Sequence, residues 1–130
     1  MFQLTDIKAA HSKVKSGADF PAYIRDLIKL GVTRYDSFVN DGHVEYFGEN
    51  NFQITAEAKY PELAVADTSN EESFNRQLKL HQQGQTDYPA FCRDAAEAGV
   101  EKWRVDMQQM TCTYFDKANN VMLEEKIPAL

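Results

Sequence analysis

Residues 19–47 read DFPAYIRDLIKLGVTRYDSFVNDGHVEYF, and residues 87–115 read DYPAFCRDAAEAGVEKWRVDMQQMTCTYF. The second stretch repeats the first at a constant offset of 68 positions without a gap, and 9 of the 29 aligned residues are identical. Further positions carry close replacements, such as Arg34 by Lys102 and Tyr35 by Trp103. Self-similarity of this kind indicates that one structural unit is written twice.

Within each copy the pattern predicts a helix followed by strands. In the first copy Asp19 is a helix-capping residue, and Pro21 lies in the first turn, where proline loses no hydrogen bond. Gly31 is expected to end that helix in a left-handed conformation. The apolar period then changes from 3.6 to 2, which predicts strands over 32–39, 43–47 and 52–59, with a tight Asp41-Gly42 turn after the first.

A further helix is expected before each copy. In the first half Thr5 is the predicted cap of a helix over 6–15, and in the second half Ser69 or Asn70 begins one that runs through Leu78. Strands are expected over 101–108, 111–116 and 121–127. The predicted order is therefore ααβββ written twice, with repeats at about 5–61 and 69–128.

The repeat also predicts the fold class. A unit of roughly 65 residues covers its own sheet poorly, whereas two units can share one core. We predict a single α+β domain over residues 1–130, pseudo-two-fold symmetric, with antiparallel strands and helices packed on one side. Two separate domains are the alternative.

Composition limits the classes of partner. The chain has 130 residues and a formal net charge of −6, which does not favour sequence-independent binding to nucleic acid or to an anionic membrane. Residues 1–18 contain no recognisable signal peptide, and no apolar run approaches the roughly 18 residues of a spanning helix. We therefore expect a cytoplasmic protein in which Cys92 and Cys112 are reduced thiols.

Three phrases carry a resemblance to a known family: KSGADFPAY at 15–23, LGV at 30–32 and DGHVEYFG at 41–48. Together they resemble the YdfO-like family, small bacterial proteins of unknown function that are often prophage-borne and sometimes labelled phage envelope protein. The resemblance covers essentially the whole chain. It implies a compact α+β domain and brings no established activity, cofactor or catalytic residue.

One polar cluster is a candidate for catalysis. His43 and Glu45 are two positions apart in a predicted strand, so they share a face, and Asp41 lies just before them. An imidazole beside a carboxylate can act as a general base with its orienting group, or as a pair of metal ligands. The second copy has no histidine at the matching position. The alternative is an exposed hairpin in which Asp41 only forms the turn.

Two matched pairs of residues are candidates for ligand binding. Arg25 and Arg93 recur at the same helix position, and arginine pairs with carboxylates and phosphates through two hydrogen bonds. Each arginine could instead fasten its own helix through an ion pair. Tyr46 and Tyr114 could line a pocket between the halves, or belong to the shared core.

Metal and cofactor motifs are not recognisable in the sequence. His11, His43 and His81 do not form an HxH or HxxxH pattern, and there is neither a CxxC pair nor a glycine-rich phosphate loop. We therefore expect no metal and no cofactor.

These observations favour a non-catalytic module that binds another protein or a small molecule. One alternative is a small enzyme that uses His43 and Glu45 as a general base pair. Another is an acidic inhibitor of a nucleic-acid enzyme, in which carboxylates imitate phosphates. Membrane partners and direct nucleic-acid binding are not expected, whereas a homodimer is compatible with the sequence.

Overall fold

The computed structural model describes residues 2–14 and 19–127. Within them the elements alternate as two helices and three strands, twice. They are α1 (Leu4–His11), α2 (Phe20–Leu30), β1 (Val32–Phe38), β2 (Val44–Gly48), the 3-10 helix η2 (Glu49–Asn51), β3 (Gln53–Ala56), α3 (Glu71–Gln82), α4 (Tyr88–Glu97), β4 (Val100–Asp106), β5 (Thr111–Asp116) and β6 (Val121–Lys126). This order confirms the predicted α+β fold class.

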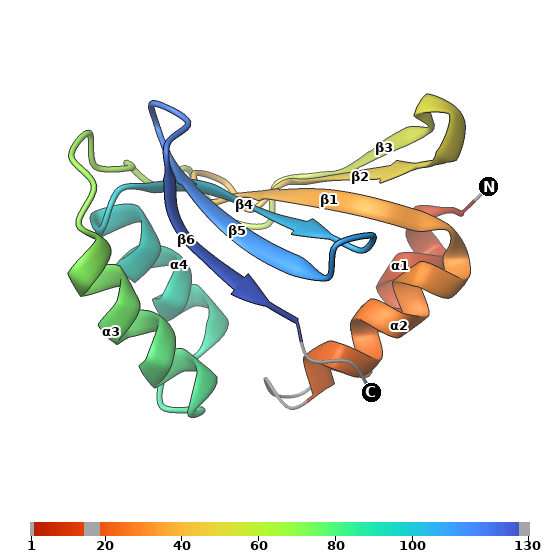
Figure 1. The fold of residues 1–130 in the computed structure, drawn as a ribbon, viewed down its shortest axis with the longest axis horizontal. Coiled ribbons are helices and arrows are strands. Elements are labelled where there is room, and N and C mark those ends of the chain that lie inside the picture. The colour runs from red at the N-terminus through yellow and green to blue at the C-terminus, as the bar shows by residue number, and fades with distance from the viewer. Residues whose placement is uncertain (1, 15–18, 128–130) are drawn as a thin grey trace.

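The strands form one antiparallel sheet in the order β3-β2-β1-β4-β5-β6. Each half contributes three neighbouring strands, and the halves join where β1 pairs with β4. Figure 1 shows the α1–α2 pair and the α3–α4 pair on the same side of this sheet, one pair toward each end. Within the residues that the structure describes, the other face of the sheet carries no helix.

The register of β1 and β4 locates the pseudo-two-fold axis. Asp36 of β1 is the register partner of Arg104 of β4, and these two residues are 68 positions apart, which is the offset of the repeat. Among the β1–β4 register pairs, this one alone joins a residue to its own repeat equivalent. The axis that relates the halves therefore passes through this pair.

The shared core lies between the sheet and the helices. Tyr35, Ser37 and Val39 from the first half and Trp103 and Val105 from the second alternate toward the helices, and all five are buried. This alternation was predicted, because successive strand residues point to opposite faces. Burial of apolar surface from both halves in one core is the main force that holds them together.

The helix ends explain where sequence and structure differ. As predicted, Gly31 ends α2 in the left-handed region with φ 101°. Asp87 caps α4 by accepting a hydrogen bond from the Ala90 backbone N–H at 2.9 Å. The expected cap at Thr5 is wrong: α1 begins at Leu4, because the backbone N–H of Gln3 donates to the Asp6 carboxylate at 3.1 Å and makes Gln3 the cap.

Four predicted strands run past their observed ends, two of them by a single residue and the strands at β3 and β4 by more. β3 ends at Ala56 because the chain then folds back: the backbone N–H groups of Lys59 and Tyr60 donate to the Asp41 carbonyl at 2.8 and 3.3 Å. β4 ends at Asp106, whose carboxylate accepts backbone hydrogen bonds from the turn that follows. The repeat boundaries stay a prediction, and the second one, at position 128, lies outside the described residues.

Candidate functional site

A cavity of about 400 Å³ lies between the segment after β3 and the first turn of α4. We call it the inter-repeat cavity, because its walls come from both halves of the chain. Its principal lining residues are Lys59, Tyr60 and Leu63 from residues 59–63, and Tyr88, Cys92 and Arg93 from α4. Its volume falls in the range of about 300–1,000 Å³ that is typical of small-molecule sites.

The wall formed by residues 59–63 is fixed to the first hairpin. The Tyr60 hydroxyl donates a hydrogen bond to the Val39 carbonyl at 2.6 Å, and the Leu63 backbone N–H donates to the Asn40 carbonyl at 2.5 Å. Gly42 makes this close approach possible, since a Cβ there would lie 2.6 Å from the Tyr60 ring. The wall is therefore preorganised by the β1–β2 turn.

The opposite wall is formed by residues of α4. Tyr88 is 40% exposed there, whereas Cys92 is only 1% exposed. Burial raises the pKa of the Cys92 thiol, which keeps it neutral at the base of the cavity.

Two cations line the cavity without a carboxylate partner. Across the part of the chain that the structure describes, no carboxylate oxygen lies within 4 Å of the Lys59 ammonium or the Arg93 guanidinium. Burial lowers the pKa of Lys59, and the nearby charge of Lys8 acts in the same direction. Glu62 also lines the cavity and is exposed. The site therefore combines apolar walls with two positive charges that have capacity for an anion.

A second, smaller cavity of about 210 Å³ lies at the ends of three strands. We call it the strand-end cavity. Arg34 of β1, Phe47 of β2 and Asp106 of β4 contribute to its wall, together with Asn51 of η2.

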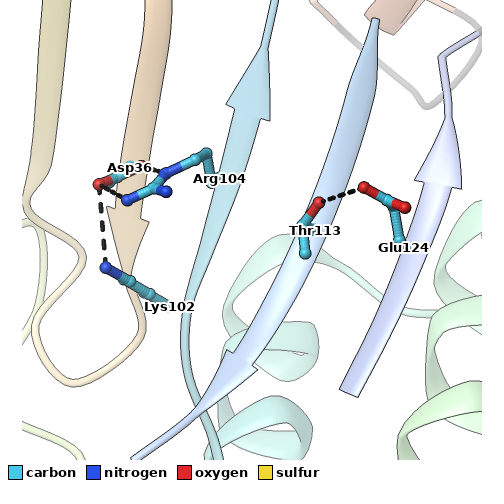
Figure 2. A network of polar contacts seen from close by, with 5 residues as sticks. All are labelled: Asp36, Lys102, Arg104, Thr113 and Glu124. Atoms are coloured by element: carbon cyan, nitrogen blue, oxygen red, sulfur yellow. Dashed lines mark hydrogen bonds and ion pairs between the residues drawn. The ribbon is translucent and has the colours of Figure 1, made fainter. Parts of the chain in front are cut away.

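The helix-free face of the sheet carries a row of polar residues, which Figure 2 shows in part. The Asp36 carboxylate is 5% exposed and accepts hydrogen bonds from Arg104 Nε at 2.8 Å and Nη2 at 3.2 Å, and Lys102 Nζ lies 4.0 Å away. The pairing extends the row across all six strands: Thr55, Glu45, Asp36, Arg104, Thr113 and Glu124. The buried acid and the partly exposed base satisfy each other here, which is a structural arrangement.

The structure brings two members of the predicted catalytic cluster into contact. His43 Nδ1 lies 2.5 Å from Asp41 Oδ1, and the imidazole stacks on Phe38 with ring centroids 4.3 Å apart. Glu45 instead faces Asp36 across the β1–β2 pair. Partial burial raises the pKa of Asp41, but hydrogen bonds from the His43 backbone and ring outweigh it and lower that pKa. His43 lines neither cavity.

The four predicted ligand-binding residues do not meet in one place. Arg93 lines the inter-repeat cavity, whereas its repeat equivalent Arg25 is exposed on α2 and lines neither cavity. Tyr46 and Tyr114 are 5% and 6% exposed and belong to the core. Burial raises the pKa of Tyr46.

The described residues contain neither a group of metal ligands nor a membrane-spanning helix. In residues 2–14 and 19–127, no group of three or more His, Cys, Asp or Glu side chains is arranged to hold a metal ion. No helix in the same residues has both the length and the apolar character required to cross a membrane.

A family model described as protein of unknown function (DUF1398) matches residues 8–126. The chain belongs to the DUF1398 family. A comparison with curated proteins gives no match. The region shared with DUF1398 includes both repeats and both walls of the inter-repeat cavity.

Sequence reasoning missed most of the cavity in this DUF1398 chain. Lys59, Tyr60, Tyr88 and Cys92 were not among the predicted site residues. A signal was present in residues 60–66, which contain Pro61 and a mostly apolar run and are too apolar for a free linker. The repeat does not indicate this site, because one of its walls, residues 59–63, lies outside the aligned stretches 19–47 and 87–115.

Proposed function

We propose that this protein is a small-ligand-binding module that holds an organic carboxylate between its two halves. The ligand would have an aromatic or branched apolar body that packs on the walls of the inter-repeat cavity. Its carboxylate would pair with Lys59 and Arg93. The observation that carries the proposal is the cavity of about 400 Å³ in which these two cations have no carboxylate partner.

The charge of the cavity supports an anionic ligand. Desolvation disfavours the charged form of an ammonium, and it lowers the pKa of Lys59 even though this residue is exposed. A carboxylate that binds beside it would restore the favourable electrostatic environment and raise that pKa again. Hydrogen bonds between charged partners contribute roughly 1.5–3 kcal/mol each, enough to distinguish a carboxylate from its neutral amide.

The walls support an apolar body. Leu63 and the exposed ring of Tyr88 offer apolar surface to the cavity. The Tyr60 hydroxyl is already engaged with a backbone carbonyl, so the ring rather than the hydroxyl faces the ligand. Such a site, apolar with few polar groups, is typical of those that bind small organic molecules.

A thermal-shift panel tests the proposal. A ligand that binds only the folded state raises the melting temperature by mass action. We expect benzoate or 4-methylpentanoate to raise the melting temperature of the wild type, and the matching amides, benzamide and 4-methylpentanamide, to raise it less. Lys59→Met and Arg93→Met should each reduce the shift caused by the acid, because they keep an apolar stem and remove the charge.

Arg25→Met is the matched control. Arg25 occupies the same helix position as Arg93 in the other repeat and is likewise exposed, but it lines neither cavity. Its substitution should leave the shift unchanged. The proposal fails if neither acid stabilises the wild type more than its amide does, or if Lys59→Met and Arg93→Met respond as the wild type does.

The alternatives have less support. The enzyme hypothesis requires His43 in a pocket with access to a substrate, and His43 lines neither cavity. The inhibitor hypothesis requires carboxylates gathered on one surface, and on the helix-free face Asp36 lies beside Lys102 and Arg104. We favour the ligand-binding module over both.

The origin and location of the protein are also proposals. The YdfO-like resemblance of residues 15–48 supports descent from a prophage. A cytoplasmic location fits the metabolite-sized cavity and the two thiols, both of which are free. Cell fractionation followed by immunoblotting checks the location directly, and recovery in the membrane or periplasmic fraction would contradict it.

A further inference from the structure

Arg34 has hydrogen-bonding capacity that the fold does not use. Its guanidinium carbon lies 4.1 Å from the centroid of the Phe47 ring, an arrangement in which the ring supports the face of the cation. The planar guanidinium can then present its edge N–H groups elsewhere. Its Nε atom is buried and has no hydrogen-bond partner. A buried donor without a partner is costly unless a ligand or water satisfies it.

Comparison of the repeats explains why Arg34 lacks a partner. Lys102 and Phe115 are the repeat equivalents of Arg34 and Phe47, and they form the same kind of contact, with Nζ 5.4 Å from the ring centroid. Lys102 also has the Asp36 carboxylate at 4.0 Å. The repeat equivalent of Asp36 is Arg104, so the corresponding place beside Arg34 holds a cation. Because the two repeats differ at this position, Arg34 lacks the carboxylate partner that Lys102 has.

A carboxylate nearby is also incompletely used. Asp106 is the register partner of Arg34 and lines the same strand-end cavity. Its Oδ1 accepts hydrogen bonds from the backbone N–H groups of Gln108 at 2.9 Å and Gln109 at 3.1 Å. Its other oxygen, Oδ2, has no hydrogen bond within the described residues. Although the strands pair at these positions, the Asp106 carboxylate and the Arg34 guanidinium are not within ion-pair distance.

We propose that the strand-end cavity binds a small zwitterion of the class of free α-amino acids with short side chains. The ligand carboxylate would pair with the edge of the Arg34 guanidinium, and its ammonium would pair with Oδ2 of Asp106. A simple anion would leave Asp106 unpaired and repelled, and a simple amine would leave Arg34 unsatisfied. The volume of about 210 Å³ is below that of drug-sized sites, which fits a molecule of this size.

This site goes beyond the function proposed above and does not depend on it. It lies on different elements from the inter-repeat cavity and shares none of its lining residues. The two sites also differ in ligand class, since the inter-repeat cavity has two cations and the exposed Glu62, whereas the strand-end cavity has one cation and one carboxylate. Failure of one proposal therefore leaves the other standing.

Titration of the ¹⁵N-labelled protein, followed by amide chemical shifts, tests the inference. The probes are L-serine, lactate, which lacks the ammonium, and ethanolamine, which lacks the carboxylate. We expect L-serine to cause saturable shifts at residues 33–34, 47–51 and 106–108, and each other probe to bind at least about tenfold more weakly. Arg34→Gln and Asp106→Asn should each lower the affinity for L-serine by at least about tenfold.

Lys102→Gln is the matched control, because Lys102 is the repeat equivalent of Arg34 and lines neither cavity. It should leave the affinity for L-serine unchanged. If Arg34→Gln does not fold, Arg34→Lys keeps the charge, loses the paired donors and should still weaken binding. Absence of saturable L-serine shifts at these residues, or lactate binding as tight as L-serine and insensitive to Asp106→Asn, would overturn the assignment.

Discussion

Asp36 and Arg104 occupy the same position in the two repeats and form an ion pair with each other on the pseudo-two-fold axis. A residue on such an axis faces its own equivalent, so two identical copies would place like charges in contact. Here one copy carries the acid and the other the base. The Asp36 side chain is 6% exposed and that of Arg104 33% exposed, so the pair is largely shielded from solvent.

Asp36→Asn should therefore destabilise the protein substantially. Removal of one partner from a buried ion pair typically costs about 3–5 kcal/mol, and we expect about 2–4 kcal/mol here because Arg104 reaches solvent. Urea unfolding measures the change in free energy. A loss well below about 1 kcal/mol would show that the pair contributes no more than a surface salt bridge.

The exchanged pair Asp36→Arg with Arg104→Asp should recover most of that loss. The axis makes the two positions equivalent, and in the exchanged protein Arg34 would stand beside Asp at 104 as Lys102 stands beside Asp36. Urea unfolding of both single variants and of the double variant gives the coupling free energy between positions 36 and 104. If the double variant loses as much as the sum of the singles, the two environments are not equivalent.

Gly42→Ala should cost more than Gly84→Ala. Both glycines have φ +78°, so both substitutions place alanine in the left-handed region at a cost of about 1–2 kcal/mol. A Cβ at position 84 meets no atom within 4 Å, whereas one at 42 lies 2.6 Å from the Tyr60 ring. We expect a difference in unfolding free energy of at least about 1 kcal/mol. Equal losses would show that Tyr60 moves aside freely.

Asp41→Asn should lower stability at neutral pH and have little effect in strong acid. The hydrogen bonds from His43 lower the pKa of Asp41 in the folded protein. A lowered pKa contributes stability that is present above the unfolded value of about 3.9 and is lost as the pH falls through the folded value. The difference in unfolding free energy between the wild type and Asp41→Asn should therefore become smaller below about pH 4. Urea unfolding at a series of pH values measures it. Glu57→Gln, at an exposed carboxylate, is the control. A difference in unfolding free energy between the wild type and Asp41→Asn that stays constant with pH would contradict the account.

Both thiols should react slowly in the folded protein. Burial raises the pKa of Cys112 to about 12 and also raises the pKa of Cys92, so little reactive thiolate is present at pH 8. We expect iodoacetamide to alkylate both far more slowly than in the urea-unfolded chain, with Cys92 faster because it lines a cavity. Mass spectrometry of Cys92→Ala and Cys112→Ala assigns each rate. Native rates equal to unfolded rates would contradict this burial.

The fold was predictable because its signals are local and repeated. Asp87 and Gly31 mark helix ends through their own backbone chemistry, and the alternation of Tyr35, Ser37 and Val39 predicts which face is buried. The start of α1 was not predictable in this way. There the side chain of Asp6 pairs with the backbone of Gln3, and this competes with an equally plausible cap at Thr5.

The candidate sites were less predictable because they depend on contacts between segments that are not repeat equivalents of each other. Arg93 was predicted as a ligand-binding residue from its recurrence, but its cavity exists only because Tyr60 folds back onto Val39. The pairing of Asp36 with Arg104 needs the register of β1 with β4, which sequence alone does not give. Once that register is known, the lack of a partner for Arg34 follows.

The most direct test of the proposed function is a titration of the ¹⁵N-labelled wild type and Lys59→Met with benzoate. The account predicts saturable shifts at residues 59–63 and 88–93 in the wild type, and binding at least about tenfold weaker in Lys59→Met. Shifts that do not saturate, that fall outside these two segments, or that persist undiminished in Lys59→Met would contradict it.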